Sequence, residues 1–376
     1  MKYPEIYLAV DNCFASKRWT DPEDWMSVIK DAGLRYVEAS ADNECDPLYC
    51  DRNYLHDWFD KVLCTAERYD IMIANLYSGH GTYSTLGLAH PDSRNADRML
   101  HQWLGSMLTA ASALQCGLGF YCHAFKQSVL DTPRVYATIL NELYHRLALL
   151  AIRARELKIP AIGVEQMYTP HQVPWTIDSA RKMLIEVKKR SGADFYLTID
   201  TGHQSGQYKF YRPGIEAIRH AIESHRQTER FDGVWLGPER AYEMVRTGAT
   251  PDEINSFLMD YSYLFAEKDD SNPYVWLEQL GAYSPIIHLQ QTEGKRSAHL
   301  PFNQACNATG IIEGRKVLNA LKKAYEQAHD PALPERCRKI YLTLEIFAGT
   351  AELPVDIIHK LNDSVSYWRN FIPEDG

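Results

Sequence analysis

The sequence lacks several features that mark large classes of proteins. It has no run of about 18 uncharged apolar residues, and Met1 to Glu5 lead straight into an apolar segment without the layout of a signal peptide. Its eight cysteines include no CxxC pair, and a chain of this length needs no disulfide bonds to fold. We therefore expect a cytoplasmic protein with reduced thiols and no membrane partner.

Positive charge is also scarce. The chain has 40 Lys and Arg residues against 49 Asp and Glu residues, which gives a net charge of −9. A surface that neutralises many phosphates needs the opposite balance, so nucleic acid is not an expected partner. With 376 residues, of which 45% are hydrophobic and 11% aromatic, the chain can bury a large core.

Apolar runs alternate with amphipathic stretches along the whole chain, a pattern typical of repeated βα units. Eight such runs lie at about 6–10, 35–40, 70–78, 117–125, 159–167, 193–203, 285–290 and 339–349. Strands that are almost continuously apolar suit a parallel sheet covered by helices. Eight repeats predict an α/β fold, a single (β/α)8 TIM barrel over residues 1–376. An open doubly wound sheet is the alternative.

The interval between the sixth and seventh predicted strands is too long for a single βα unit. Asp200 and His288 are 88 positions apart, whereas one βα unit needs roughly thirty residues. We predict an insertion at 204–272 between the sixth and seventh strands, with helices at 212–225 and 251–266, after which 273–281 resumes the barrel. Such an insertion can cover a binding pocket at the end of the barrel, or it can contact another subunit in a homo-oligomer.

Ionisable side chains stand at the ends of the predicted strands. Glu165, Asp200, His288 and Glu345 each end an apolar run, and strand ends of a parallel barrel meet on one face. An unpaired buried carboxylate costs several kcal/mol, which a divalent cation would offset. This oxygen-rich set with one imidazole suits Mn²⁺, Mg²⁺ or Co²⁺, and Zn²⁺ is compatible. The alternative is that these groups pair with Arg and Lys across the barrel mouth.

Four segments carry a resemblance. GVEQM at 163–167, LTIDTGH at 197–203, IIHLQQTEGK at 286–295 and LTLEIF at 342–347 resemble the metal-site strands of the xylose isomerase-like TIM-barrel superfamily, in its sugar (phosphate) isomerase and epimerase branch. The resemblance implies one divalent ion, Mn²⁺ first, held by Glu165, Asp200, His288 and Glu345, with a ketose chelated beside it. The run HLQQTEGK is most similar to members acting on short ketose phosphates such as tetruloses. The long insertion departs from the compact family pattern and leaves substrate size and oligomeric state open.

Removing a proton next to a carbonyl produces an enediolate, whose charge a chelated metal stabilises. Glu165 and Glu345, from strands five and eight, can then act as base and acid on opposite sides of a bound sugar. Return of the proton to the same carbon gives epimerisation, and return to its neighbour gives aldose–ketose isomerisation. The sequence favours neither.

Other polar residues are candidates for substrate binding. His203 has a place similar to the family histidine that hydrogen-bonds a substrate oxygen, against a purely structural role. Lys295, Arg296 and His299 follow the seventh strand and can hold a phosphate or carboxylate, unless they form a solvated basic turn. His80 and His123 are candidate pocket residues, and Glu38 can orient a ligand or a sugar hydroxyl.

Three rival functions remain at this stage. A zinc phosphodiesterase resembling AP endonucleases would use His80, His123, His299 and the other strand-end ligands, but Ser297 stands where its Asp is expected, and the net charge disfavours DNA. A dehydratase or decarboxylase of a sugar acid would use the same barrel. A non-catalytic protein would merely hold an ion or a sugar at the acidic strand ends.

Overall fold

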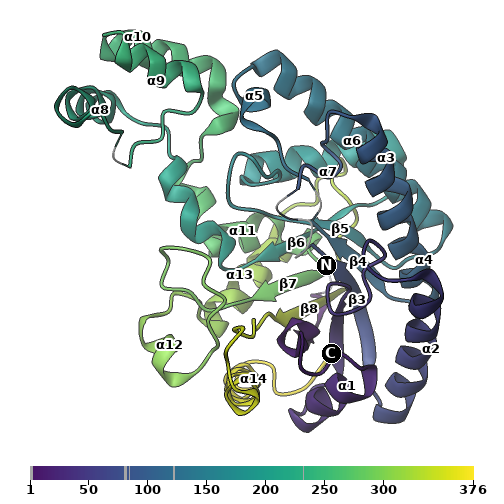
Figure 1. Cartoon of the computed structure of the whole chain (residues 1–376). Helices are drawn as coiled ribbons and strands as arrows, with labels where there is room; N and C mark the ends of the chain where they lie inside the picture. Colours follow the sequence, from purple (N-terminus) through teal and green to yellow (C-terminus); the bar gives the residue numbers. More distant parts are fainter. Residues whose placement is uncertain (1–2, 80–82, 84, 122, 232) are drawn as a thin grey trace.

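Eight parallel strands close into a barrel in the order β1 to β8 (Figure 1). The computed structural model describes residues 3–79, 83, 85–121, 123–231 and 233–376. The strands are β1 (Glu5–Asp11), β2 (Tyr36–Ser40), β3 (Met72–Ser78), β4 (Gly117–Phe120), β5 (Ile162–Glu165), β6 (Tyr196–Asp200), β7 (Ile286–Leu289) and β8 (Lys339–Leu344). Pairing of β1 with β8, from Glu5 opposite Lys339 to Val10 opposite Leu344, closes the ring. The predicted (β/α)8 barrel is confirmed, and the open sheet is excluded.

Helices cover the outside of the barrel. The α-helices are α1 (Pro22–Asp31), α2 (Arg52–Tyr69), α3 (Ser93–Asp97), α4 (Gly105–Leu114), α5 (Gln127–Leu130), α6 (Pro133–Glu156), α7 (Ile177–Ser191), α8 (Ile215–Thr228), α9 (Glu239–Arg246), α10 (Pro251–Phe257), α11 (Pro273–Leu280), α12 (Gln304–Thr309), α13 (Gly314–Glu326) and α14 (Pro354–Arg369). The 3₁₀ helices are η1 (Asn12–Ala15), η3 (His203–Phe210), η4 (Leu258–Leu264), η5 (Lys268–Ser271) and η6 (Gly281–Tyr283). Among the described residues, no helix is both long enough and apolar enough to cross a membrane.

Local sequence signals place the helix starts. Asp21 accepts a hydrogen bond from the backbone N–H of Glu23, and Pro22 occupies the first turn of α1, where its missing N–H costs nothing. The helix then buries Trp25, Met26 and Ile29. The side chain of Thr176 caps α7 in the same way, in a reciprocal box with Ser179.

Two helical stretches are interrupted. Between α3 and α4 lies a π-helical stretch, η2 (Arg98–Leu104), which buries Leu100, Trp103 and Leu104. Its wider turn changes which residues face the core, a change that helical periodicity alone does not reveal. The helix expected over 251–266 ends as an α-helix at Phe257 and continues as η4, which is kinked at Tyr261.

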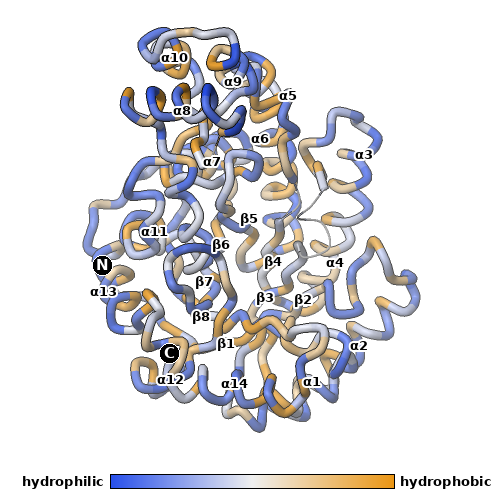
Figure 2. Tube along the Cα trace, turned by 60° about the vertical axis from the view of Figure 1, so that its left-hand side comes forward, coloured by the Kyte–Doolittle hydropathy of each residue, from blue (hydrophilic) through white to orange (hydrophobic). Residues whose placement is uncertain are grey.

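The segment between β6 and β7 builds a group of helices that projects from the barrel (Figure 1). Helices α8, α9 and α10 gather at one end of the molecule and carry hydrophilic and hydrophobic residues in alternation (Figure 2). Their buried residues include Ile218, Val245 and Ile254. The ring of Tyr263 stacks on that of Tyr136, with centroids 4.0 Å apart, and ties the group to α6.

The amino-terminal end of the barrel holds a cluster of aromatic rings. Tyr7, Tyr36 and Tyr341 pack against one another, with ring centroids 4.7 to 5.6 Å apart. Side chains alternate along a strand, so these rings share the inner face with Asp11, Glu38 and Glu345. The polar residues lie at the opposite, carboxyl-terminal end of the same strands.

Candidate active site

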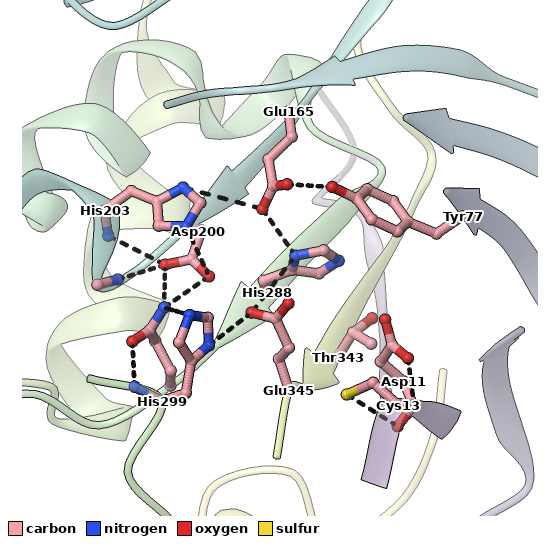
Figure 3. A network of polar contacts seen from close by, with 12 residues as sticks. Asp11, Cys13, Tyr77, Glu165, Asp200, His203, His288, His299, Thr343 and Glu345 are labelled. Carbon is pink, nitrogen blue, oxygen red and sulfur yellow. Dashed lines mark hydrogen bonds and ion pairs between the residues drawn. The ribbon is translucent and has the colours of Figure 1, made fainter. Parts of the chain in front are cut away.

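The four strand-end side chains predicted as metal ligands meet inside the barrel mouth (Figure 3). Nδ1 of His288 on β7 lies 3.0 Å from Oε1 of Glu165 on β5 and 3.8 Å from Oε2 of Glu345, which follows β8. Ligand atoms of Glu165, Asp200 and His288 all lie within 4.8 Å of one another. A second group with the same spacing joins Asp200 and Glu345 to His299. Each of the four predicted ligands is at most 4% exposed.

Hydrogen bonds fix the carboxylate of Asp200. Its Oδ1 accepts from the backbone N–H groups of Gly202 at 2.6 Å and His203 at 3.0 Å. Nε2 of Gln290 donates to both carboxylate oxygens, at 2.8 and 2.9 Å. Oε1 of Gln290 accepts from the backbone N–H of His299 at 2.7 Å. Gln290 therefore connects Asp200 to the loop that carries His299.

The ring of His288 is held between carboxylates. Its Nε2 lies 2.8 Å from Oε2 of Glu38, whose other oxygen accepts a hydrogen bond from Nδ2 of Asn75 at 2.7 Å. This outer pair turns Nδ1 toward Glu165 and Glu345, the arrangement in which a carboxylate orients a metal-binding histidine. The hydroxyl of Tyr77 donates to Oε2 of Glu165 and orients that carboxylate as well.

Burial and crowding shift the pKa values in this cluster. Burial raises the pKa of Glu345 well above its ordinary value, and the charges of Asp200 and Glu165 add to the effect against the opposing charge of His288. Burial acts most strongly against ionisation of Glu165, but the charge and hydrogen bond of His288 together with the charge of His203 outweigh it, so the pKa is lowered. Burial disfavours a charged His288, yet Glu38, Glu345 and Glu165 together raise its pKa well above the usual value. The protein groups around His288 and Glu345 therefore favour the protonated form of each.

These observations fit a divalent cation. Oε2 of Glu345 is buried, lies 3.2 Å from Nδ1 of His299, and accepts no hydrogen bond from any described residue. The carboxylates of Asp200 and Glu345 are close enough to share a hydrogen bond, which requires a proton or a cation between them. Three carboxylates and one imidazole are a donor set suited to Mn²⁺, Mg²⁺ or Co²⁺.

A cavity of about 560 Å³ opens above the cluster. Its described lining includes Glu165, Glu345 and the two histidines His203 and His299. Nδ1 of His203 donates to the backbone carbonyl of Gln166 at 2.7 Å, so Nε2 is the nitrogen left for a ligand. No described residue of 204–272 lines this cavity.

The structure places other predicted site residues elsewhere. Lys295 and Arg296 are exposed and line a separate surface cavity together with Lys209. Glu38 lies below the cavity, on the far side of His288. His123 is fully buried and is not among the described lining residues, because its Nε2 is bonded to the carbonyl of Val173. His80 lies outside the described residues.

The buried His123 predicts a pH effect on stability. Burial lowers its pKa from 6.5 to about 4, so between these pH values the unfolded chain binds a proton that the folded protein does not. Stability therefore falls as the pH drops through this range, by about 3 kcal/mol at roughly 1.4 kcal/mol per pKa unit. We expect His123→Gln to remove this part of the acid destabilisation in urea unfolding at pH 7 and pH 4.

The control is His56→Gln, which alters a histidine exposed on α2 and should leave the acid destabilisation unchanged. Equal losses of unfolding free energy between pH 7 and pH 4 in the wild type and in His123→Gln would contradict the assignment.

The sequence reasoning missed several polar groups of the site. Asp11 ends β1 as Asp200 ends β6, and its ligand atom lies within 4.8 Å of those of Glu38 and His288. The same strand-end rule would have found it. Lys17 and Asn43 line the cavity from loops after β1 and β2, where no strand pattern gives the direction of a side chain.

One segment of the chain is similar in sequence to a known enzyme. A segment of 108 residues, 28% of the chain, is 40% identical to D-erythrulose 1-phosphate 3-epimerase of Brucella abortus and spans 31% of that enzyme. The matched segment thus spans about a third of the length of that curated relative. No protein-family model matches the chain.

Solved structures match over nearly the whole chain. The fold is similar to that of a proposed xylose isomerase from Rhodospirillum rubrum, with a TM-score of 0.71, 15% identity, and coverage of 97% of this chain and 99% of the other. It is also similar to D-psicose 3-epimerase from Clostridium cellulolyticum, with a TM-score of 0.57, 11% identity, and coverage of 97% and 98%. These likenesses concern the fold: the chain is a TIM barrel whose fold is similar to that of a proposed xylose isomerase and of a sugar 3-epimerase.

Proposed function

We propose that this protein is a metal-dependent epimerase or isomerase of a short ketose or ketose phosphate, with a tetrulose phosphate as the first candidate. The observation that carries the proposal is that Glu165, Asp200, His288 and Glu345 lie together in two ligand groups that share Asp200, at the base of a cavity. The relative that acts on erythrulose 1-phosphate supports the choice of substrate.

Glu165, Asp200, His288 and Glu345 would hold the ion, Mn²⁺ first and Co²⁺, Mg²⁺ or Zn²⁺ otherwise. Such an ion supplies Lewis-acid stabilisation of the negative charge that develops on a ketose oxygen. Glu38 positions His288 for this role through the 2.8 Å contact at Nε2. Gln290 and the two backbone N–H groups keep Asp200 in place.

Glu165 and Glu345 are the base and the acid of the proposed proton transfer. They extend from β5 and from the end of β8, so they approach a ligand in the cavity from different sides of the barrel (Figure 3). Their pKa values are shifted in opposite directions, with that of Glu165 lowered and that of Glu345 raised. Two carboxyl groups in different environments supply a base and an acid at the same pH. Glu165 removes the proton next to the carbonyl, and Glu345 delivers one.

The rival functions fit less well. A three-metal phosphodiesterase would use His123, which is bonded to a backbone carbonyl and lies outside the described cavity lining. A dehydratase and a non-catalytic binder use the same cluster and differ in the fate of the proton and the hydroxyl group. One isotope experiment therefore separates them.

Purified protein loaded with Mn²⁺ is incubated in D₂O with free and phosphorylated C4 to C6 ketoses. We expect one deuterium at the carbon next to the carbonyl, because the abstracted proton exchanges before it returns. Mass spectrometry and proton NMR locate the label and identify the product. Release of water from the sugar would identify a dehydratase, and absence of label from every ketose would refute the proposal.

A further inference from the structure

The catalytic cavity has a polar side that the metal cluster does not use. The cluster residues Glu165, Asp200, His288 and Glu345 come from β5 to β8. The loops after β1 and β2 contribute Ser16, Lys17, Asp42, Asn43 and Glu44 to the described lining. A sugar bound at the cluster and filling the cavity reaches these loops.

The side-chain amide of Asn43 has no hydrogen-bond partner among the described residues. The residue is 2% exposed, and neither Oδ1 nor Nδ2 makes a hydrogen bond with any described residue. An unsatisfied buried polar group costs about 1–3 kcal/mol, and native proteins rarely leave both ends of an amide unpaired. Because Asn43 lines the cavity, a ligand is the natural partner for this amide.

Lys17 supplies the charge beside it. Among the described lining residues it is the one Lys or Arg, and its ammonium forms no ion pair with any described carboxylate. The nearby carboxylate of Asp42 is engaged elsewhere, because its Oδ2 accepts from the backbone N–H of Gly79 at 3.0 Å. Glu44 adds an exposed negative charge to the same rim.

Backbone strain marks the same loops. Seven non-glycine residues of the described chain have positive φ, and Asp70, Gln115, Lys158 and Glu229 occur where α2, α4, α6 and α8 end. The other three all line the catalytic cavity: Lys17 at 67°, which follows the end of the 3₁₀ helix η1, Glu44 at 67° and His299 at 45°. Such strain persists where the surrounding structure enforces it, and it concentrates at ligand sites.

We propose that Ser16, Lys17 and Asn43 form the subsite that binds a phosphate monoester on the ketose. This inference rests on the proposed function and assigns the residues that select the phosphorylated substrate. The Lys17 ammonium, the Asn43 amide N–H and the Ser16 hydroxyl donate to the phosphate oxygens. Lys295 and Arg296 do not take this role, because they line a separate cavity. Glu44 limits the affinity by repulsion.

The test compares erythrulose 1-phosphate with erythrulose, by turnover and by calorimetric binding to the Mn²⁺-loaded protein. Lys17→Met should raise KM and Kd for the phosphorylated sugar by about 10- to 100-fold and change those for erythrulose by less than about threefold. Asn43→Asp, which keeps the shape of the side chain, should weaken binding of the phosphorylated sugar and leave binding of erythrulose unchanged. Glu44→Gln should tighten binding of the phosphorylated sugar by about two- to fivefold.

Lys295→Met is the matched control, since it removes the same charge outside the cavity. It should change neither KM nor Kd for either sugar. Equal effects of Lys17→Met on both sugars, or no effect, would overturn the subsite. The two proposals fail separately. If deuterium exchange occurs with erythrulose but binding of the phosphorylated sugar does not depend on Lys17, the epimerase proposal stands and the subsite proposal is wrong. If binding of the phosphorylated sugar depends on Lys17 but no exchange occurs, the subsite proposal stands and the epimerase proposal is wrong.

Discussion

A Glu345→Gln variant is expected to turn over its ketose about 10²- to 10⁴-fold more slowly than the wild type, the range typical for loss of a general acid or base. The amide keeps the size of the side chain but can neither deliver nor accept the proton. Its heat stability should equal or exceed that of the wild type when no cation is added, because burial and the charge of Asp200 oppose ionisation of the carboxyl group that the amide replaces. Steady-state rates and thermal unfolding give both quantities.

The matched control is Glu326→Gln, which alters an exposed carboxylate on α13 and should leave the rate unchanged. Assays run in excess Mn²⁺ correct for weaker metal binding, and the metal content of the variant is measured directly. A Glu345→Gln variant that retains more than about a tenth of the wild-type rate would contradict a role in proton transfer.

Removing divalent ions with a chelator should lower the turnover rate by at least about 10³-fold, because an ion in this site would supply several kcal/mol of charge stabilisation. Returning Mn²⁺ at about 100 times its Kd should restore the rate and add about 2.7 kcal/mol to the free energy of unfolding. The affinity should fall as the pH is lowered from 7 to 5, because carboxylate and imidazole ligands must be deprotonated to bind. Calorimetry and thermal unfolding measure these effects.

Asp200→Asn provides the comparison for metal binding. The variant keeps a side chain of nearly the same shape on β6 and loses the charge at the centre of both ligand groups. Mn²⁺ should therefore stabilise it far less than it stabilises the wild type. A chelated protein with full activity, or equal stabilisation of the wild type and Asp200→Asn, would rule out the metal site.

The strand pattern was enough to predict the barrel and the meeting of Glu165, Asp200, His288 and Glu345. Each of these residues ends an apolar run, and closure of a parallel barrel brings such ends together whatever the helices do. Asp11 obeys the same rule and was overlooked because the predicted strand stopped at residue 10. The π-helical stretch Arg98–Leu104 could not be foreseen, since its side-chain spacing differs little from that of an α-helix over one turn.

Loop residues were harder to place than strand residues. Lys295 and Arg296 follow the seventh strand as closely as His299 does, yet they turn outward while His299 lies against Glu345. The hydrogen bonds from the backbone of His299 to Gln290 and from the hydroxyl of Thr292 to the carbonyl of Arg296 set these directions. Such contacts depend on the folded loop and leave no periodic signal in the sequence.

The aromatic cluster of Tyr7, Tyr36 and Tyr341 has a consequence for the order of events at the site. It packs the lower end of the barrel, so an ion and a sugar would both enter from the opposite end, where the cavity opens. The ligand atoms of Asp200 and His288 lie at the bottom of that route, with both residues fully buried. If the proposed function holds, an ion would therefore have to bind before the ketose and leave after it, so that a bound sugar would keep the ion in the site.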